Sequence, residues 1–587
     1  MRLLLLTHSF NSLSQRLFAE LTARGHALAV EYDIADAVTE EAVALFRPEL
    51  VIAPYLRRAI PATVWSRHVC LVVHPGIVGD RGPSALDWAI LRGETEWGVT
   101  VLQANAVLDG GDVWAERRFL LRQARKGSVY RHEVTEAACQ AVLEAVDRLA
   151  DFTAGRWRPR PQADWPGRRG QPHALMKQDD RAIDWQRDPT DRVLAKINAA
   201  DGFPGVRDVL FGHPCQLFDA TPEAIFRGPP GALIGRRETA LCRATVDGAV
   251  WIGHVKRADA PHPFKLPATR AFPRESSALP ERALDGWWRR AHATWQDIRY
   301  EEGGEVGVLS FDFYNGAMSP RQCERLRQAF AFATSRPTRV IVLAGGADFW
   351  SNGIHLNLIE AGGELDADGH AASVADASWA NIHAMNDLAR DILCAERQLT
   401  VAVLQGNAGA GGCFLARACD EVWARAGVIL NPHYKNMGNL YGSEYWTYLL
   451  PRRVGAESAQ AIMQRRLPLL ADAARDIHLI DAVLAGEPDA FRREAAERAA
   501  HWAQSPCFEE RLAKKIAQRH FDEAEKPLAV YRAEELACMR RNFYGFDPSY
   551  HVARYHFVLK SPASWTPRHL ARHRAGANGH SPAEQSA

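Results

Sequence analysis

Four short apolar runs in the first 75 residues most constrain what this chain can fold into. They are RLLLLTH (2–8), ALAVEY (27–32), ELVIAPY (49–55) and CLVVH (70–74), and each has the length and composition of a buried β-strand. Between the first two, SLSQRLFAELTARG has helical spacing and ends at Gly25, a typical residue after a helix C-terminus. Strands that alternate with helices predict a parallel sheet, whose ligands bind beyond the carboxyl ends of the strands.

The chain continues well beyond this region, because 587 residues are too many for one hydrophobic core. We predict an α/β multidomain protein with a first domain over 1–165. Short β-like segments such as CQLFDA and LCRATVDGAVWIGHVK predict a small, OB-like β-barrel domain over 177–262. A proline-rich stretch without periodicity predicts a linker over 263–295. A second α/β domain is expected over 296–565, opening with a hairpin in IRYEEGGEVGVLSFDF, and a disordered tail over 575–587.

Charge and cysteine usage exclude several function classes. The formal net charge is +1, so no global electrostatic attraction to nucleic acid or to an anionic membrane is expected. The ten cysteines are scattered without CxxC spacing, and HEVTE (132–136) lacks the second histidine of a zinc-binding HExxH motif. We therefore predict no metal site. The N-terminal apolar run is too short for a signal peptide and no run approaches a membrane span, so we expect a cytoplasmic protein.

The first candidate site lies in residues 72–113. His74 closes a predicted strand and Pro75 forces a turn, which places the imidazole at the carboxyl edge of the sheet. Asp109 lies 35 residues further on, in the turn LDGGD. A carboxylate can orient a histidine and stabilise its charged form, so the two form a candidate acid–base pair. Taken alone, His74 also fits a structural histidine, and Asp109 also fits an aspartate that only stabilises a turn.

The whole stretch carries the pattern HP…RG.S(A)..W.I..G….GVT…LD.GD. This pattern resembles the family of 10-formyltetrahydrofolate-dependent formyltransferases and hydrolases, over residues 1–262. In addition, QDDRAIDWQRDPTDRVLAKINAADGFPG (178–205) resembles the start of the second domain of methionyl-tRNA formyltransferase. The resemblance implies that His74 and Asp109 surround the formyl group, and it implies folate-binding residues at Tyr55, Leu56, Arg57, Arg81, Gly82 and Leu108. Val72 stands where the family has asparagine, which removes a hydrogen-bond donor to the formyl oxygen. A tRNA acceptor is disfavoured, because no basic-aromatic surface stands out.

A second candidate site lies in two glycine-containing loops that each follow a predicted buried strand. The loops are AGGADFWSNGIHL (344–356) and GNAGAGGCFLARACD (406–420). A dinucleotide motif GxGxxG is not satisfied, because it would need glycine at Phe414. The glycines alone also fit tight helix packing.

Together the two loops resemble the crotonase (enoyl-CoA hydratase/isomerase) superfamily, over about 296–545. The resemblance implies a coenzyme A site in which the backbone N–H groups of Ile354 and Gly411 hold a thioester carbonyl, lined by Asn352, Gly353 and Gly412. Phe414 replaces one hydratase glutamate, and the other is missing at or beside His433–Tyr434, so hydration is not expected. Tyr434, Tyr441 and Glu444 remain as candidates for proton transfer, and each fits packing or exposed surface equally well.

The order of the domains, together with NPHYKNMGNLYGSEYWTYLLPRRVG (431–455), resembles the HoxX-type [NiFe]-hydrogenase maturation factor family over nearly the whole chain. The resemblance implies formyl transfer from 10-formyltetrahydrofolate to coenzyme A, followed by decarbonylation of formyl-CoA to carbon monoxide. It also implies transient contact with the hydrogenase maturation machinery. Decarbonylation needs no activated water, and Phe414 is then a residue that excludes it.

Three alternatives stay open at this point. A formyl hydrolase would release formate without coenzyme A, and a formyl-CoA synthase would release no carbon monoxide. A non-catalytic scaffold would tolerate changes at His74 and Asp109. The sequence leaves open the oligomeric state and the route of a formyl thioester between the sites.

Overall fold

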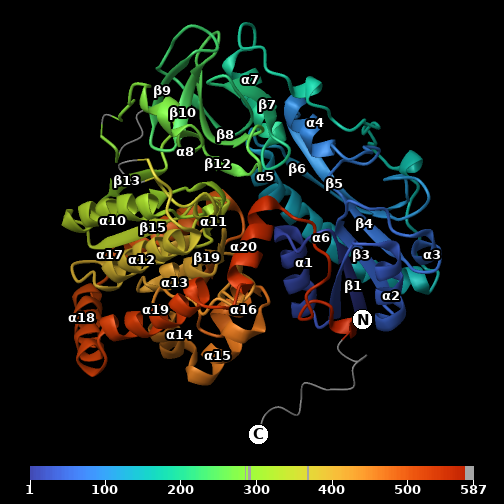
Figure 1. The fold of residues 1–587 in the computed structure, drawn as a ribbon. Helices are drawn as coiled ribbons and strands as arrows, with labels where there is room; N and C mark the ends of the chain where they lie inside the picture. Colours follow the sequence, from blue (N-terminus) through green and yellow to red (C-terminus); the bar gives the residue numbers. More distant parts are fainter. Residues whose placement is uncertain (285, 289–291, 366–368, 575–587) are drawn as a thin grey trace.

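The computed structural model describes residues 1–284, 286–288, 292–365 and 369–574. The tail predicted to be disordered, 575–587, lies outside these residues. Figure 1 shows three parts that follow one another along the chain: an N-terminal α/β part, a middle β part and a larger C-terminal α/β part. Within the described residues, none of the helices combines the length and apolar character needed to cross a membrane.

The N-terminal part is built on a six-stranded sheet of order β2-β1-β3-β4-β5-β6. Its strands are β1 Arg2–Thr7, β2 Ala27–Tyr32, β3 Leu50–Tyr55, β4 Cys70–His74, β5 Glu96–Gln103 and β6 Val113–Leu120. Strands β1 to β4 are parallel and β5 runs against both of its neighbours. The four predicted strands and their parallel arrangement are confirmed. The helices are α1 Ser12–Ala23, α2 Asp36–Phe46, α3 Ala62–Trp65, α4 Ala85–Arg92, α5 Lys126–Val129 and α6 Thr135–Thr153.

Burial on both faces explains why these strands are continuous apolar runs. In β1, residues 3–6 are all leucine and are at most 1% exposed. Alternate leucines belong to separate hydrophobic clusters on the two faces of the sheet. His74 is the last residue of β4, so its side chain starts at the carboxyl edge of the parallel strands, as predicted.

The middle part is an antiparallel sheet of order β7-β8-β11-β10-β9, with β12 paired to β11. It comprises α7 Thr190–Ala200, β7 Val206–Leu210, β8 His213–Glu223, β9 Leu233–Arg237, β10 Ala240–Ala244, β11 Ala249–Arg257 and β12 Lys265–Pro267. Strands β10 and β11 form a hairpin, with Ala244 opposite Ala249.

The linker prediction for 263–295 is wrong in its first half. Strand β12 and the short helices α8 Ala268–Ala271 and α9 Pro273–Ser277 occupy it. Phe272 is fully buried in the core of the middle part. Elements of three to five residues are too short to show a hydrophobic period, which is why the segment resembles a linker in sequence.

The C-terminal part contains two sheets, with orders β13-β14-β15-β17-β19-β22 and β16-β18-β20-β21. The first comprises β13 Ile298–Gly303, β14 Val306–Phe311, β15 Val340–Ala344, β17 Leu399–Leu404, β19 Glu421–Arg425 and β22 Ala482–Leu484. The second comprises β16 Phe349–Ser351, β18 Asn407–Gly409, β20 Ile429–Asn431 and β21 Leu469–Leu470. The predicted β13–β14 hairpin is confirmed.

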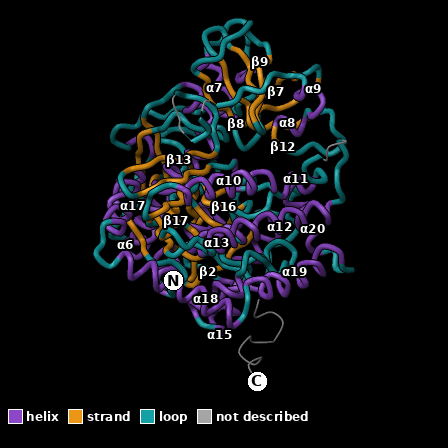
Figure 2. Tube along the Cα trace, turned by 90° about the vertical axis from the view of Figure 1, so that its left-hand side faces the viewer, coloured by secondary structure: helices purple, strands orange, loops and turns teal. Residues whose placement is uncertain are grey.

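Helices enclose both sheets (Figure 2). They are α10 Pro320–Ser335, α11 Leu356–Glu360, α12 Val374–Leu393, α13 Gly411–Arg417, α14 Trp446–Val454, α15 Ala456–Arg465, α16 Ala471–Asp476, α17 Pro488–Ala503, α18 Phe508–Glu525, α19 Leu528–Tyr544 and α20 Ser549–Leu559. The glycines at the start of α13 and the loop before α14 belong to the second candidate site.

After α20 the chain returns to the N-terminal sheet and covers its edge strand β2, where Figure 1 shows the last segment beside α2 and β1. The Val30 N–H donates to the Leu570 carbonyl at 3.0 Å. Glu31, which is fully buried, accepts from His573 Nε2 at 2.9 Å and pairs with Arg574 at 2.7 Å. Thr566 donates its hydroxyl to the same carboxylate. The two ends of the described chain are thus fastened together around one buried carboxylate.

Candidate active sites

The N-terminal site brings His74 close to two carboxylates. Asp109 Oδ2 lies 3.6 Å from His74 Nδ1, so the predicted pair does come together. That distance is too long for a hydrogen bond. The hydrogen bond is made instead by Asp80, whose Oδ1 lies 2.9 Å from His74 Nε2, and both of these side chains are almost completely buried. Asp80 is a residue that the sequence reasoning missed.

Tight turns hold this arrangement. A Cβ at Gly76 would lie 2.4 Å from His74 Nε2 and 2.8 Å from Asp80 Oδ1, so only glycine fits between the two side chains. Asp109 has a left-handed backbone with φ 50°, and its Oδ2 accepts the Gly82 N–H at 3.1 Å. Asp80 lies six residues after His74 in the turn HPGIVGDRG, and an acidic residue in such a turn was the available signal.

The predicted folate-binding residues follow neighbouring strands. Tyr55 ends β3, and Leu56 and Arg57 come directly after it, with the Arg57 N–H donating to Asp33 at 2.8 Å. The segment Arg81–Gly82 follows β4 and contacts Asp109 through Gly82. Leu108, in the loop before Asp109, is 67% exposed. Because β3 and β4 are adjacent and parallel, both segments lie along the same carboxyl edge of the sheet.

At the C-terminal site the two glycine loops meet. A Cβ on Gly353 would lie 3.4 Å from the Gly411 nitrogen, and a Cβ on Gly412 would lie 2.1 Å from the Ser351 carbonyl oxygen. Gly353 has φ 79°, a conformation that favours glycine. Asn352 lies in the same loop and donates its side-chain amide to the Asn315 carbonyl at 2.8 Å. Ile354 follows Gly353 and is half-buried, so the loop that carries its N–H lies next to the N-terminus of α13, as the crotonase resemblance predicts.

The Glu444 carboxylate lies directly over these two loops. The site formed by the Ile354 and Gly411 N–H groups is called the cradle below. A Cβ added to Gly411 would be 2.6 Å from Glu444 Oε1. The Tyr434 hydroxyl lies 2.5 Å from Glu444 Oε2, and the Phe414 ring stacks on Tyr434 with centroids 5.7 Å apart. The structure therefore brings together Gly411, Phe414, Tyr434 and Glu444. The ring of the third candidate, Tyr441, packs instead on Trp446.

An unusual backbone aims Glu444 at the cradle. Glu444 and Tyr445 are consecutive left-handed residues, with φ 61° and 59°. Such a conformation costs about 1–2 kcal/mol for each non-glycine residue. Asn386 Oδ1 accepts the Glu444 N–H at 2.7 Å, and the Glu535 carboxylate accepts the Tyr445 N–H at 3.0 Å. These two buried residues, which the sequence reasoning also missed, offset the strain.

Burial changes the acidity of this cluster. It raises the pKa of Glu444 to about 7 and that of Glu535 to about 8. It also raises the pKa of Tyr434 well above its ordinary value, and the facing Glu444 raises it further. Glu444 can therefore exchange a proton near neutral pH, while Tyr434 stays protonated.

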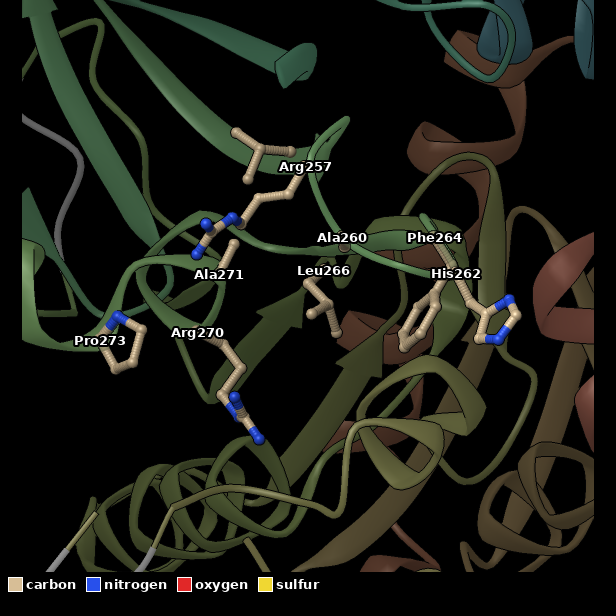
Figure 3. Close-up of a pocket in the computed structure, with 9 residues that line it drawn as sticks. Arg257, Ala260, His262, Phe264, Leu266, Arg270, Ala271 and Pro273 are labelled. Carbon is tan, nitrogen blue, oxygen red and sulfur yellow. The ribbon is translucent and has the colours of Figure 1, made fainter. Parts of the chain in front are cut away.

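A separate hollow of about 160 Å³ lies in the middle part of the molecule (Figure 3). Arg257 on its wall pairs with Asp259, and the Arg270 guanidinium binds the Ala361 and Gly363 carbonyls. Both guanidinium groups already have partners, and none of the residues that line the hollow belongs to the N-terminal or the C-terminal candidate site. Within the described part of the chain, no group of three or more histidine, cysteine or acidic residues is placed to hold a metal ion.

Comparison with known proteins relates each part of the chain to a family. Residues 23–146 match the formyl transferase family, 175–262 the formyl transferase C-terminal domain and 306–566 the enoyl-CoA hydratase/isomerase family. The hydrogenase maturation factor HoxX of Bradyrhizobium diazoefficiens is 55% identical over 98% of this chain and 97% of its own length. The crystal structure of HypX from Aquifex aeolicus with tetrahydrofolic acid is 46% identical over 98% of this chain and 99% of its own, with a TM-score of 0.92. Methionyl-tRNA formyltransferase of Pelobacter propionicus is 27% identical over 37% of this chain and 67% of its own.

Proposed function

Since the chain belongs to the HoxX/HypX family of hydrogenase maturation factors, we propose that it makes carbon monoxide in two steps from 10-formyltetrahydrofolate and coenzyme A. The first step transfers the formyl group to the thiol, and the second decarbonylates formyl-CoA. The observation that carries the proposal is the Glu444 carboxylate lying against Gly411, in a crotonase-like cradle where Phe414 replaces the hydratase acid.

The N-terminal site is suited to the first step. The relative from Aquifex aeolicus was crystallised with tetrahydrofolic acid, and we assign folate binding here to the carboxyl edge of β3 and β4, around Tyr55–Arg57 and Arg81–Gly82. The thiol sulfur attacks the formyl carbon, the bond from that carbon to N10 breaks, and N10 takes a proton. His74 and Asp109 are the groups that face this chemistry.

The C-terminal site is suited to the second step. The Ile354 and Gly411 N–H groups hold the formyl carbonyl oxygen while the Glu444 carboxylate takes the proton from the formyl carbon. The C–S bond then breaks, which leaves carbon monoxide and a thiolate, and Glu444 or Tyr434 returns the proton to sulfur. The fully buried Phe414 ring keeps water from attacking the thioester, which would yield formate.

The test is a product assay on the purified chain. Incubation with 10-formyltetrahydrofolate, with and without coenzyme A, is followed by assay of carbon monoxide through the spectral shift of haemoglobin, and of formate and formyl-CoA. Carbon monoxide that requires coenzyme A supports the proposal. Formate without carbon monoxide would point to a hydrolase, formyl-CoA that accumulates would point to a synthase, and no turnover would favour a scaffold.

Two variants separate the steps. His74→Ala is expected to abolish formyl transfer while coenzyme A still binds, and retained transfer would refute its assignment. Glu444→Gln is expected to accumulate formyl-CoA without carbon monoxide.

Transient contact with the hydrogenase maturation machinery remains a prediction, which co-purification with the hydrogenase precursor would test.

A further inference from the structure

His74 faces a carboxylate on each side of its ring, and the two contacts differ in kind. On one side Nε2 is hydrogen-bonded to Asp80 Oδ1 at 2.9 Å, out of contact with solvent. On the other side Nδ1 is 3.6 Å from Asp109 Oδ2, which already accepts the Gly82 N–H. Asp80 is therefore the residue that orients the imidazole.

This orientation selects a tautomer. When the ring is neutral, the only hydrogen that can be donated to Asp80 is on Nε2, which leaves the lone pair of Nδ1 free. An imidazole held by a buried carboxylate on one nitrogen and free on the other acts as a general base. If Nδ1 gains a proton, the positive charge lies between Asp80 and Asp109, which stabilises it.

A thiol acceptor needs such a base. An alkyl thiol has a pKa of about 8.5, so about 3% is thiolate at pH 7. A neutral amine acceptor, by contrast, is a good nucleophile without first losing a proton, whereas a thiol reacts as its thiolate. The side chain of Val72 has no hydrogen-bond donor to offer the formyl oxygen. We propose that Asp80 and His74 form the dyad that deprotonates the coenzyme A thiol, an inference that deepens the proposed formyl transfer and rests on it.

His74 can accept and return the one proton that moves in this step. The thiol proton moves to His74 Nδ1 as sulfur bonds to the formyl carbon. The imidazolium N–H then faces the developing oxyanion, a role that the side chain at 72 cannot fill. As the bond from the formyl carbon to N10 breaks, the imidazolium gives its proton to N10, and His74 is neutral again. Asp80 holds Nε2 throughout the step and acts as a positioning residue.

The second oxygen of Asp80, Oδ2, is buried and makes no hydrogen bond, and a histidine lies near it. His173 Nε2 lies 3.4 Å from Asp80 Oδ2, and Arg92 lies 3.3 Å from the same histidine nitrogen. The loop that carries His173 is fixed over the turn, since its N–H donates to the Arg81 carbonyl at 2.8 Å. The charged groups that face the dyad are therefore Asp109 on one side and His173, backed by Arg92, on the other.

Asp80→Asn is the decisive variant, because an asparagine can donate its amide to Nε2 and so favour the tautomer with the proton on Nδ1. We expect kcat for formyl-CoA formation at pH 7 to fall about 10²–10⁴-fold, with little change in the KM for 10-formyltetrahydrofolate. The deficit should shrink about 25-fold between pH 7 and pH 9, because the thiolate fraction rises from about 3% to about 75% over that range. A purely structural role would give a deficit that does not depend on pH.

Asp112→Asn is the matched control, because Asp112 is exposed and lies in the same loop as Asp109. It should retain the kcat and pH profile of the unaltered protein. A second measurement needs no change at Asp80: ¹⁵N NMR of histidine-labelled protein, with the His74 signals identified by their loss in His74→Gln, should show an unprotonated Nδ1.

Two results would overturn the dyad: an Asp80→Asn protein with unaltered kcat at pH 7, or a His74 that carries its proton on Nδ1. In either case formyl-CoA formation by the unaltered protein would leave the proposed function standing. If the unaltered protein forms no formyl-CoA, the proposed function fails first and the dyad falls with it.

Discussion

Glu444 should make the protein less stable as the pH rises, because the folded state holds its carboxyl group in a buried site. Burial raises its pKa from an ordinary 4.5 to about 7. A raised pKa stabilises the folded state fully below pH 4.5, and this stabilisation is lost as the pH rises to about 7. The difference between the two pKa values corresponds to about 3 kcal/mol of unfolding free energy.

Glu444→Gln removes this titration and keeps an oxygen that accepts from Tyr434. The variant should match the unaltered protein near pH 4.5 and exceed its unfolding free energy by up to about 3 kcal/mol at pH 8. It should at the same time lose carbon monoxide release, so stability and activity change in opposite directions. In the unaltered protein, release should rise with pH through about 7, as Glu444 becomes the carboxylate that accepts the formyl proton.

The assay is urea unfolding of the full chain, followed by tryptophan fluorescence at pH 5, 6, 7 and 8. The difference between the two proteins is the quantity to compare, because it cancels the titrations of all groups that Glu444 does not influence; the neighbouring Glu535, whose pKa Glu444 helps to raise, changes with it. Glu301→Gln, in the exposed β13–β14 hairpin, is the control and should show no pH-dependent difference. A constant difference across this range, or a Glu444→Gln protein that is less stable at pH 8, would refute the reasoning.

Three further changes test other contacts. Phe414→Glu should raise formate at the expense of carbon monoxide, whereas Phe414→Leu should keep the product ratio; an unchanged ratio in both would refute the water-excluding role. Gly411→Ala places a methyl carbon 2.6 Å from Glu444 Oε1, which displaces the carboxylate, so formyl-CoA should form without carbon monoxide, and normal gas release would contradict the proposed role of this site. Glu31→Ala leaves buried donors, including His573, without their acceptor and should lower the unfolding free energy by about 1–3 kcal/mol, measured by urea unfolding. An unchanged urea midpoint would mean that the contacts between Glu31 and the C-terminal segment contribute nothing to stability.

The hydrophobic periodicity, and the order of strands and helices along the chain, were enough to predict the α/β multidomain fold class. The runs at 2–8 and 70–74 have continuous apolar centres because both faces of their sheet are covered, and such a run can be recognised from the sequence alone. The pairing of His74 with Asp109 was supported by family resemblance, whereas Tyr434 and Glu444 were only separate candidates for proton transfer and their contact with each other was not predicted. The first half of 263–295 was missed because its elements, of three to five residues, are too short to show a repeating hydrophobic pattern.

The residues that orient the sites could not be predicted in the same way. Asp80 meets His74 only because the turn at Gly76 folds without a side chain in between. Glu535 lies on α19, far along the chain from the left-handed residues that it holds, and a single buried glutamate on a helix has no distinctive sequence context. Such contacts depend on the packing of separate elements, which neither spacing nor composition encodes.

The fastening of the chain ends around Glu31 has a consequence for biosynthesis. Glu31 leaves the ribosome about 540 residues before His573, which at about 5–20 residues per second is a delay of roughly half a minute to two minutes. During that time β2 is an open sheet edge, and its glutamate has none of the partners that later bury it. The N-terminal part is thus synthesised before the middle and C-terminal parts but completed after them. Under the proposed function, the half that makes the formyl thioester is completed only after the half proposed to consume it has been synthesised.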